Sequence, residues 1–431
     1  MIPQNPAKHV LILFLVLTFF TSCFGTYQEN PYADVPELDK KISSKPVYSG
    51  FSKLVRHRST STTTSSSNKV VINVDDFAAK ADGTDDSEAF NKAWDKACSS
   101  KQTATIVVPN RIYHLKPITF LGPCQSDLIF QIYGTIKASN KMSEYEDDRR
   151  HWIVFDNVNN LKVQGGGIIN GNGRIWWENS CKINKDMAVT FNESRNLIVS
   201  NLWFKNAQKM HLRFEKCINV KAMNLLVTAP GNSPNTDGIH VTGTHSIRIT
   251  NSVIRTGDDC ISIVNGSRYV EATDIICGPG HGISIGSLGA NNSEAEVSGV
   301  CVDRATLSGT TNGVRIKTWQ GGSGYAKDIV FKNLIMKNVT NPIIIDQNYC
   351  DQDDPCKEQK SAVQVSNVMY RNIQGTSASE VAMKFDCSKT FPCQGILLQD
   401  IILGLEEDEL AKAYCVNVKL TDMGKVSPQC Y

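Results

Sequence analysis

Short strand-like runs recur through the second part of the chain at a nearly constant spacing. From about residue 150, runs rich in Val and Ile alternate with Gly, Asn and Ser. Four of them align on positions 197, 220, 247 and 270, which lie 23, 27 and 23 residues apart. Val297, Ile329 and Val368 continue the series less regularly. Such self-similarity is typical of a repeat fold, in which each unit packs only on its neighbours.

This repeat predicts an all-β parallel β-helix, a single-stranded solenoid. No amphipathic helix is apparent after residue 150, so each coil should contribute a few short strands that pair with the next coil about 4.8 Å away. Inward Val, Ile and Leu would form a dry core, while Asn and Gly would allow sharp corners. A β-propeller is the alternative, but its blades need about 40–50 residues.

The first 68 residues lack this pattern. Lys8 and His9 precede an apolar run at residues 10–20, and small residues follow it, which predicts a secretory signal over residues 1–25. A retained anchor is the alternative. Residues 26–68 contain a Ser/Thr tract that has too little apolar surface to fold. We interpret residues 26–68 as a flexible leader or pro-segment, and a disordered tail is the alternative.

Folded structure is predicted from residue 69 to residue 431, as one β-helix domain. Residues 70–74 form a strand-like apolar run, and residues 85–88 have the composition of a helix start. The residues that follow at helical spacing are Ala89, Phe90, Ala93, Trp94 and Ala97. We expect this short helix to cap the N-terminal end of the β-helix.

The fourteen cysteines indicate an oxidising, extracellular compartment. Without Cys23 of the signal thirteen remain, so at least one thiol lacks an intramolecular partner. Close spacing favours five bridges: Cys98–Cys124, Cys260–Cys277, Cys350–Cys356, Cys387–Cys393 and Cys415–Cys430. Three cysteines have no obvious mate: Cys181, Cys217 and Cys301. No CxxC pair occurs, which argues against a zinc site, and we predict no metal.

The composition limits the partners of this chain. Hydrophobic residues make up 41% and charged residues 20%, as in a soluble protein. The net charge of +2 is too small to indicate nucleic-acid binding. No apolar run after the signal is long enough for a membrane span, and no feature requires an oligomer, so we expect a monomer. The sequons at Asn192, Asn265, Asn291 and Asn338 are candidate glycosylation positions.

Three polar motifs lie about one repeat apart. They are Asn235-Thr-Asp237-Gly, Gly257-Asp258-Asp259-Cys and Gly280-His281-Gly. Asp237 and Asp258 are separated by 21 residues, and Asp258 and His281 by 23. Because residues one coil apart stack, these side chains should meet on one face, with Asp258 and His281 at equivalent positions. Asp259 can join them only from a strand end or bend, because strand neighbours face opposite sides.

This cluster predicts a catalytic site. Carboxylates held close together repel when ionised, which favours retention of a proton by one of them. A general acid beside ionised carboxylates is what hydrolysis of a glycosidic bond requires. Each motif alone could be a simple turn, where Asp is common, but their coincidence at coil spacing favours a site. The alternation in Gly313-Val-Arg315-Ile-Lys317 places both cations on one strand face, which suits a sugar carboxylate or a solvated surface.

Taken together, the motifs resemble those of plant polygalacturonases, glycoside hydrolase family 28. The resemblance rests on Ser233–Gly238, Gly257–Ser262, Cys277–Gly286 and Arg315–Lys317, and it extends to Trp176-Trp177 and Asp346-Gln-Asn-Tyr349. It runs from about residue 70 to residue 430. It implies a right-handed parallel β-helix with an open groove, and hydrolysis of α-1,4-galacturonosyl bonds in de-esterified pectin with inversion and without a cofactor. We predict an endo-acting, secreted enzyme of the cell wall.

The resemblance also assigns roles. It implies that Asp258 is the general acid, that Asp237 and Asp259 activate the attacking water, and that His281 supports the protonation of the acid. It implies that the substrate is bound by Arg315, Lys317, Tyr349 and Asn235. Trp319 could stack on a sugar or pack inside the protein.

One departure from the family pattern follows Cys181. Plant members usually carry a second cysteine in a loop soon after this position, and that loop is missing here. Its loss would leave Cys181 without a mate and would alter a groove wall. Three alternatives therefore stay open: a lyase with the same fold, a pectin-binding wall protein without turnover, and a hydrolase of another pectic backbone.

Overall fold

A computed structural model describes residues 69–145, 151–178, 189–351, 356–406 and 409–430 of the chain. The chain divides into two units, Met1–Ser67 and Asn68–Tyr431, and all described residues belong to the second unit. The predicted signal at 1–25, the leader at 26–68 and the altered loop after Cys181 therefore lie outside the described residues.

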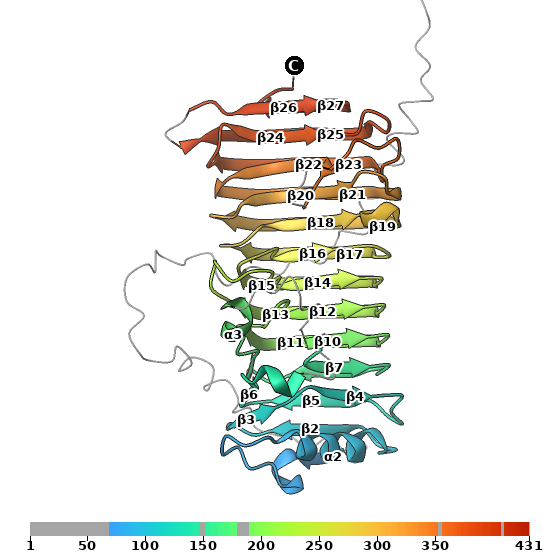
Figure 1. Cartoon of the computed structure of the whole chain (residues 1–431), viewed down its shortest axis with the longest axis vertical. Helices are drawn as coiled ribbons and strands as arrows, with labels where there is room; N and C mark the ends of the chain where they lie inside the picture. Colours follow the sequence, from blue (N-terminus) through green and yellow to red (C-terminus); the bar gives the residue numbers. More distant parts are fainter. Residues whose placement is uncertain (1–68, 146–150, 179–188, 352–355, 407–408, 431) are drawn as a thin grey trace, which may run out of the picture. The chain divides into compact units, whose positions relative to one another are not determined.

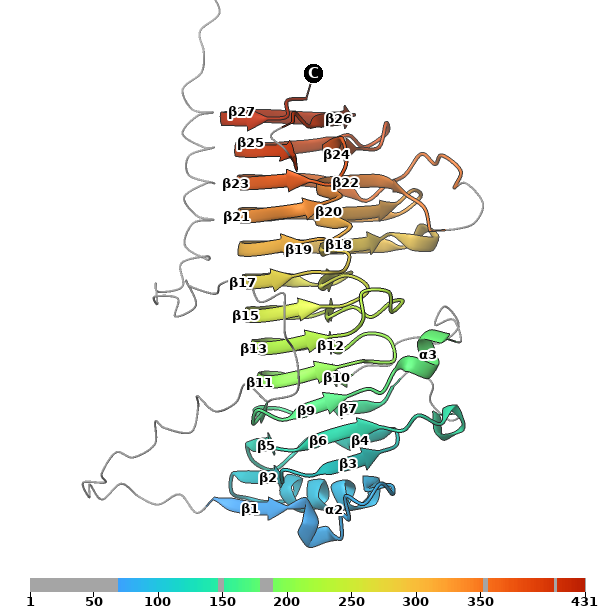
Figure 2. The same cartoon turned by 90° about the vertical axis from the view of Figure 1, so that its left-hand side faces the viewer.

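Two parallel sheets run through the second unit, and their strands stack coil upon coil (Figures 1 and 2). Sheet A has sixteen strands: β1 (Val70–Asn73), β2 (Ala104–Val108), β3 (Ile112–Leu115), β5 (Leu128–Ile132), β6 (Thr135–Ala138), β8 (Leu161–Gln164), β9 (Ile168–Asn170), β11 (Arg195–Lys205), β13 (Ile218–Thr228), β15 (His245–Arg255), β17 (Arg268–Cys277), β19 (Glu294–Ser308), β21 (Ser323–Val339), β23 (Gln364–Ser377), β25 (Cys393–Leu405) and β27 (Val418–Ser427). Sheet B has eleven: β4 (Ile118–Leu121), β7 (Ile153–Asp156), β10 (Val189–Asn192), β12 (Leu212–Glu215), β14 (Ile239–Thr242), β16 (Ile261–Ile263), β18 (Ile283–Leu288), β20 (Asn312–Trp319), β22 (Asn341–Tyr349), β24 (Val381–Asp386) and β26 (Lys412–Val416).

The helices of the described residues are short. They are α2 (Ser87–Cys98), α3 (Arg174–Glu178), and the 3-10 turns η2 (Val74–Phe77), η3 (Met142–Tyr145) and η4 (Ala290–Asn292). The helix α3 was not expected after residue 150, because a five-residue segment is too short to show helical periodicity. No helix in the described part of the chain is long and apolar enough to cross a membrane.

Strand register confirms the repeat. Leu197 pairs with Val220, Val220 with Ile247, and Ile247 with Val270. The predicted next member, Val297, is wrong, because Val270 pairs with Val300. The turn η4 lengthens the connection before β19 and breaks the regular spacing. The predicted all-β parallel β-helix is therefore confirmed, with one exception in its spacing.

The core consists of inward side chains that stack from one coil to the next. Phe155, Phe191 and Phe214 come from three consecutive strands of sheet B, and their rings are stacked at centroid distances of 4.9 and 5.5 Å. Ladders of Ile and Val continue the same arrangement through later coils, as in Ile239, Ile261 and Ile283. Because each inward residue covers its neighbour in the next coil, the stack buries apolar surface along its whole length.

The predicted capping helix is α2. Its five apolar residues at helical spacing, named above, are all buried. Trp94 packs against Phe120 at 4.9 Å between ring centroids and against Phe155 at 5.7 Å. In Figure 1 the helix lies beside the first strands of the stack. It therefore covers apolar side chains that no earlier coil can cover.

All five predicted disulfides are present, and Cys217 is a buried free thiol. The expectation that Cys301 lacks a mate is wrong, because this residue is disulfide-bonded. Sequence spacing identifies bridges only between cysteines that are close in the chain. Cys181 lies outside the described residues.

The four sequons differ in accessibility. Asn265, Asn291 and Asn338 are exposed, whereas Asn192 is half-buried. The amide of Asn192 donates a hydrogen bond of 2.8 Å to Asp156. The serine of the same sequon, Ser194, is fully buried. Glycosylation at Asn192 would disrupt these contacts. The same holds for Asn265, whose amide donates to the backbone oxygen of Glu294 at 3.2 Å and whose sequon serine, Ser267, is fully buried. Asn291 and Asn338 are therefore the better acceptors.

Candidate active site

The polar motifs occupy three consecutive turns that lead into strands of sheet B. Asp237 precedes β14, the pair Asp258-Asp259 precedes β16, and His281 precedes β18. The turn before β16 requires a glycine at 257, because a Cβ there would lie 1.9 Å from the carbonyl oxygen of Ser233. The turns thus bring acids that are distant in sequence to one edge of the sheet.

The strand register corrects one expectation about this cluster. Ile261 pairs with Ile283, so the residue equivalent to His281 is Asp259 and not Asp258. The reason lies in the turns. Ile254 pairs with Cys277 in sheet A, which leaves six residues before Ile261 but only five before Ile283. The extra residue allows two adjacent aspartates to enter one site, although neighbours on a regular strand would diverge.

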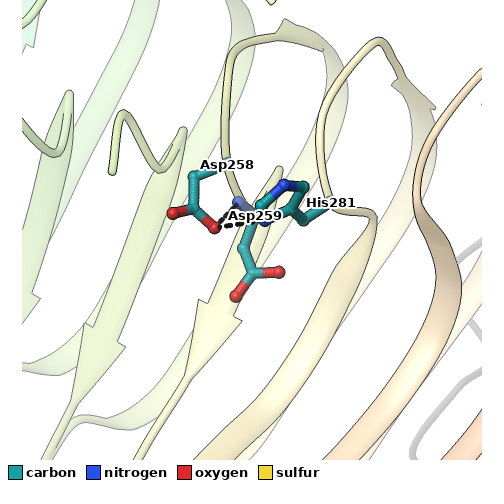
Figure 3. A group of neighbouring side chains, drawn as sticks. All are labelled: Asp258, Asp259 and His281. Atoms are coloured by element: carbon teal, nitrogen blue, oxygen red, sulfur yellow. Dashed lines mark hydrogen bonds and ion pairs between the residues drawn. The ribbon is translucent and has the colours of Figure 1, made fainter. Parts of the chain in front are cut away.

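Asp258 and His281 form a hydrogen-bonded pair. Nδ1 of His281 lies 2.9 Å from Oδ1 of Asp258, and Figure 3 shows the two side chains pointing toward each other. The amide of Asn235 donates to the other oxygen of Asp258 at 3.2 Å. The backbone N–H of Asp259 also donates to Asp258, at 2.8 Å. The structure thus brings together three predicted residues.

Asp259 lies in a different environment, because its carboxylate is 3% exposed and surrounded by donors. It accepts hydrogen bonds from Ser284 at 2.6 Å, Arg315 at 3.1 Å and Lys317 at 3.2 Å. The two cations come from alternate positions of β20, as predicted. The two cations therefore hold an aspartate, a contact that the sequence did not predict.

Asp237 is bound by two residues that were not recognised in the sequence. The hydroxyl of Ser262 donates to Oδ2 of Asp237 at 2.7 Å. Nδ1 of His240 lies 2.7 Å from the same hydroxyl and 3.9 Å from Asp237 Oδ2. A signal was present, since His240 alternates with the buried Ile239 and Val241 and so had to face outward.

The site shifts the pKa values of its groups in opposite directions. Burial raises the pKa of Asp237, and the charges of Asp258 and Asp259 add to this effect. Burial also acts to raise the pKa of Asp258, but the hydrogen bond and the charge of His281 outweigh it and lower the value to about 2. The hydrogen bond to Asp258 raises the pKa of His281. In the free protein the proton of this pair therefore resides on His281.

Tyr349 lies at the end of β22, beside the cations. Nζ of Lys317 is 5.5 Å from the centre of the Tyr349 ring. The ring of Trp319 contacts Tyr349 edge-on at 5.3 Å. Trp319 thus packs against a neighbouring aromatic ring, which was the second of its two predicted roles. Together these contacts fix the Tyr349 ring next to the ammonium group.

Asp258, Asp259 and His281 are also the one group of metal-ligating side chains found among the described residues, with potential ligand atoms within 4.8 Å of one another. Figure 3 shows that the carboxylate of Asp259 points away from the other two side chains. His281 already binds Asp258 through Nδ1, and Asp259 is bound by two cations. These contacts suit acid–base chemistry better than a cation site.

Comparison with known families now adds to this geometry. The sequence pattern of the family described as Glycosyl hydrolases family 28 matches residues 98–426. The chain belongs to this family. Family 28 membership confirms the resemblance predicted from the motifs, and it shows that the chain is a glycoside hydrolase.

Relatives named as polygalacturonases match between 77% and 98% of the chain. Polygalacturonase QRT2 of Arabidopsis thaliana is 55% identical over 98% of this chain and 99% of its own length. A polygalacturonase of Persea americana is 62% identical over 77% of this chain and 73% of its own length. Polygalacturonase-2 of Solanum lycopersicum is 56% identical over 84% of this chain and 80% of its own length.

Solved structures show the same fold. The endo-xylogalacturonan hydrolase of Aspergillus tubingensis superposes with a TM-score of 0.73 at 25% identity, over 83% of this chain and all of that chain. The polygalacturonase of Erwinia carotovora superposes with a TM-score of 0.67 at 23% identity, over 85% of this chain and 99% of that chain. The stacked sheets described above are therefore the fold of family 28.

Proposed function

We propose that this family 28 hydrolase cleaves α-1,4-galacturonosyl bonds of polygalacturonate, with inversion and within the polymer chain. Curated relatives at 55–62% identity are named as polygalacturonases. The observation that carries the proposal is the contact of Asp259 with Arg315 and Lys317, directly beside the Asp258–His281 pair. A polyanionic substrate needs such cations next to the reacting bond.

The acid function is assigned to Asp258 and His281 acting together. A proton on Nδ1 of His281 can pass along the 2.9 Å hydrogen bond to Asp258. Asp258 would then donate it to the oxygen of the leaving sugar, as glycoside hydrolysis requires. Asn235 holds the other oxygen of Asp258 and so orients this carboxyl group. Asp237 and Asp259 would activate the attacking water.

The substrate carboxylate would be bound by Arg315 and Lys317. Each has donors beyond those used by Asp259, because a guanidinium carries five N–H groups and an ammonium three. Tyr349 lies beside the ammonium of Lys317 and would contact the same sugar. A neutral sugar would leave these cations paired only with Asp259, which favours galacturonate over neutral hexoses.

Endo-action is favoured by the position of the site within sheet B. The motifs precede β14, β16 and β18, while β4, β7, β10 and β12 lie on one side and β20, β22, β24 and β26 on the other. A polymer laid along this sheet could therefore extend past the reacting bond in both directions. An exo-enzyme would require one direction to be closed.

We further propose secretion to the cell wall after removal of residues 1–25, with a catalytic domain at residues 69–431 and a monomeric state. Five disulfides support an oxidising compartment. Cleavage of de-esterified pectin at that location would loosen the wall or separate cells.

The test is an assay of reducing ends released from polygalacturonate by the wild-type protein and by Asp258→Asn. We expect the variant to lose at least a hundredfold in kcat, the range typical of general acids. Proton NMR of the first product should show inversion, and short oligomers of mixed length should appear early if cleavage is endo. Undiminished activity of Asp258→Asn would contradict the assignment.

The alternatives give different products. A lyase would create a double bond that absorbs in the ultraviolet, whereas a hydrolase would not. A pectin-binding protein would retain polygalacturonate without releasing reducing ends. Because one structural neighbour is an endo-xylogalacturonan hydrolase, xylogalacturonan should be assayed in parallel, and a preference for it would identify another pectic backbone as the substrate.

A further inference from the structure

Two serines hold two of the catalytic carboxylates in the same way. Ser262 donates to Asp237 at 2.7 Å, and Ser284 donates to Asp259 at 2.6 Å. The serines are register partners on β16 and β18, and both are buried. Each buried hydroxyl thus binds one of the two aspartates.

Each serine hydroxyl also contacts a residue of a neighbouring strand, and these two residues differ in whether they can accept a hydrogen bond. Nε of Arg315 donates to the hydroxyl of Ser284 at 3.1 Å, and Arg315 is the register partner of Ser284. Nδ1 of His240 lies 2.7 Å from the hydroxyl of Ser262, and His240 is the register partner of Ser262. A guanidinium can only donate, whereas an imidazole can donate or accept.

We infer that Asp237, rather than Asp259, accepts the proton of the attacking water, and that Ser262 and His240 form a relay that removes this proton from Asp237. The inference rests on the proposed function, because it divides the roles of two carboxylates in that reaction. Ser262 and His240 are positioning residues in this scheme, since they act through Asp237.

The step is balanced in protons. Asp237 takes a proton from water as the oxygen bonds to the sugar carbon. While Asp237 is ionised, the Ser262 hydroxyl donates to it. Once Asp237 is protonated, this hydroxyl turns toward Nδ1 of neutral His240, whose proton is on Nε2. The O–H bond of Asp237 then breaks as Ser262 accepts that proton, and the hydroxyl proton of Ser262 passes to Nδ1 of His240. Asp237 becomes a carboxylate again and His240 an imidazolium. The proton leaves from His240 to water, since 12% of this side chain is exposed.

Asp259 cannot use the same route. Its carboxylate already faces Arg315 and Lys317, at 3.1 and 3.2 Å. Arg315, which contacts the hydroxyl of Ser284, is a guanidinium and has no free lone pair to receive a proton. Asp259 is therefore suited to orient the water and to balance the charge of the cations.

Among the described residues, charged groups face His240 from β12 and from its own segment. On β12 its register partner is Arg213, which forms an ion pair with Glu215 at 3.0 Å. On β16 it faces Ser262, and Asp237 precedes it on its own segment. Burial raises the pKa of Asp237, and the hydrogen bonding and charge of His240 act against this rise. Loss of His240 should therefore raise that pKa further.

The test compares Ser262→Ala with Ser284→Ala and adds His240→Asn, which can donate to Ser262 but cannot accept its proton. The readout is the pH dependence of kcat and kcat/KM on polygalacturonate. We expect Ser262→Ala and His240→Asn each to lower kcat by about ten- to hundredfold and to move the acidic limb to higher pH. Ser284→Ala should leave the acidic limb in place. The double variant Ser262→Ala/His240→Asn should be no slower than the worse single variant.

The matched control is His245→Asn, which makes the same change at an exposed position on sheet A and should keep wild-type kinetics. Thermal unfolding checks that every variant is folded. Unchanged acidic limbs for Ser262→Ala and His240→Asn, or additive losses in the double variant, would overturn the relay. The proposed function fails separately, if Asp258→Asn keeps its activity.

Discussion

Nδ1 of His281 lies 2.9 Å from Oδ1 of Asp258, so that an imidazole and a carboxylate share one proton at the edge of sheet B. The pKa of His281 is raised and that of Asp258 is lowered to about 2. His281 stabilises the fold below its unfolded pKa and ceases to do so as the pH rises through its folded pKa. Asp258 stabilises the fold above its unfolded pKa and ceases to do so as the pH falls toward 2. The pair is therefore most stabilising between about pH 4 and pH 6.5.

The first prediction concerns the alkaline limb of activity. Since the shared proton is lost as the pH rises through the raised pKa of His281, kcat should fall at that limb. His281→Asn should lower kcat by about a hundredfold and shift the limb, because the variant has no imidazole to supply the proton. Measurement of kcat from pH 3 to pH 8 checks this. An unchanged limb would exclude His281 as the proton store.

The second prediction concerns Lys317. Its ammonium is 11% exposed and faces the 3% exposed carboxylate of Asp259. Lys317→Met should raise KM for polygalacturonate and should reduce the free energy of unfolding by about 2–4 kcal/mol, because a buried carboxylate loses one of its two cations. The same change at Lys412, which pairs with Glu380 on the surface, should cost less than about 1 kcal/mol. Equal losses at both positions in chemical denaturation would contradict this prediction.

The third prediction concerns the disulfide Cys260–Cys277. Cys260 follows Asp259 directly, and both sulfurs are buried under the turn that carries the two aspartates. The double variant Cys260→Ser/Cys277→Ser should lose about 2–5 kcal/mol of stability. It should also lose a larger fraction of kcat than Cys387→Ser/Cys393→Ser, which removes a disulfide on later coils. Comparison of unfolding and kcat for the two double variants checks this, and equal effects on kcat would show that the bridge does not position the acids.

The fourth prediction concerns Tyr269, which is 69% exposed and has a φ of 56°. The same corner position two coils earlier is occupied by Asn219, with a φ of 59°. Because asparagine tolerates this left-handed conformation better than a bulky residue, Tyr269→Asn should stabilise the protein by about 0.5–1 kcal/mol. Phe191→Ala, in the stacked core, should destabilise it by about 3–5 kcal/mol. Thermal unfolding of both variants tests the pair, and destabilisation by Tyr269→Asn would contradict the argument.

Residue spacing alone predicts the architecture and places the polar motifs on one edge of a sheet. The register of Leu197, Val220, Ile247 and Val270 follows from spacing, because a stacked repeat must align its apolar positions to bury them. Five disulfides followed from short separations. The acids at coil spacing predict a hydrolytic site.

The hydrogen-bond partners within that site depend on how the coils pack on one another. The turn before Ile261 has one residue more than the turn before Ile283, and this residue allows both Asp258 and Asp259 to enter one site. It is recognised only when the strand registers of the two sheets are compared. The contacts of Asp237 with Ser262 and of Asp259 with Ser284 join residues 25 positions apart. Periodicity places such residues on one face, but the direction and length of each hydrogen bond depend on how neighbouring coils are packed. The different surroundings of the three carboxylates are therefore a property of the assembled coils.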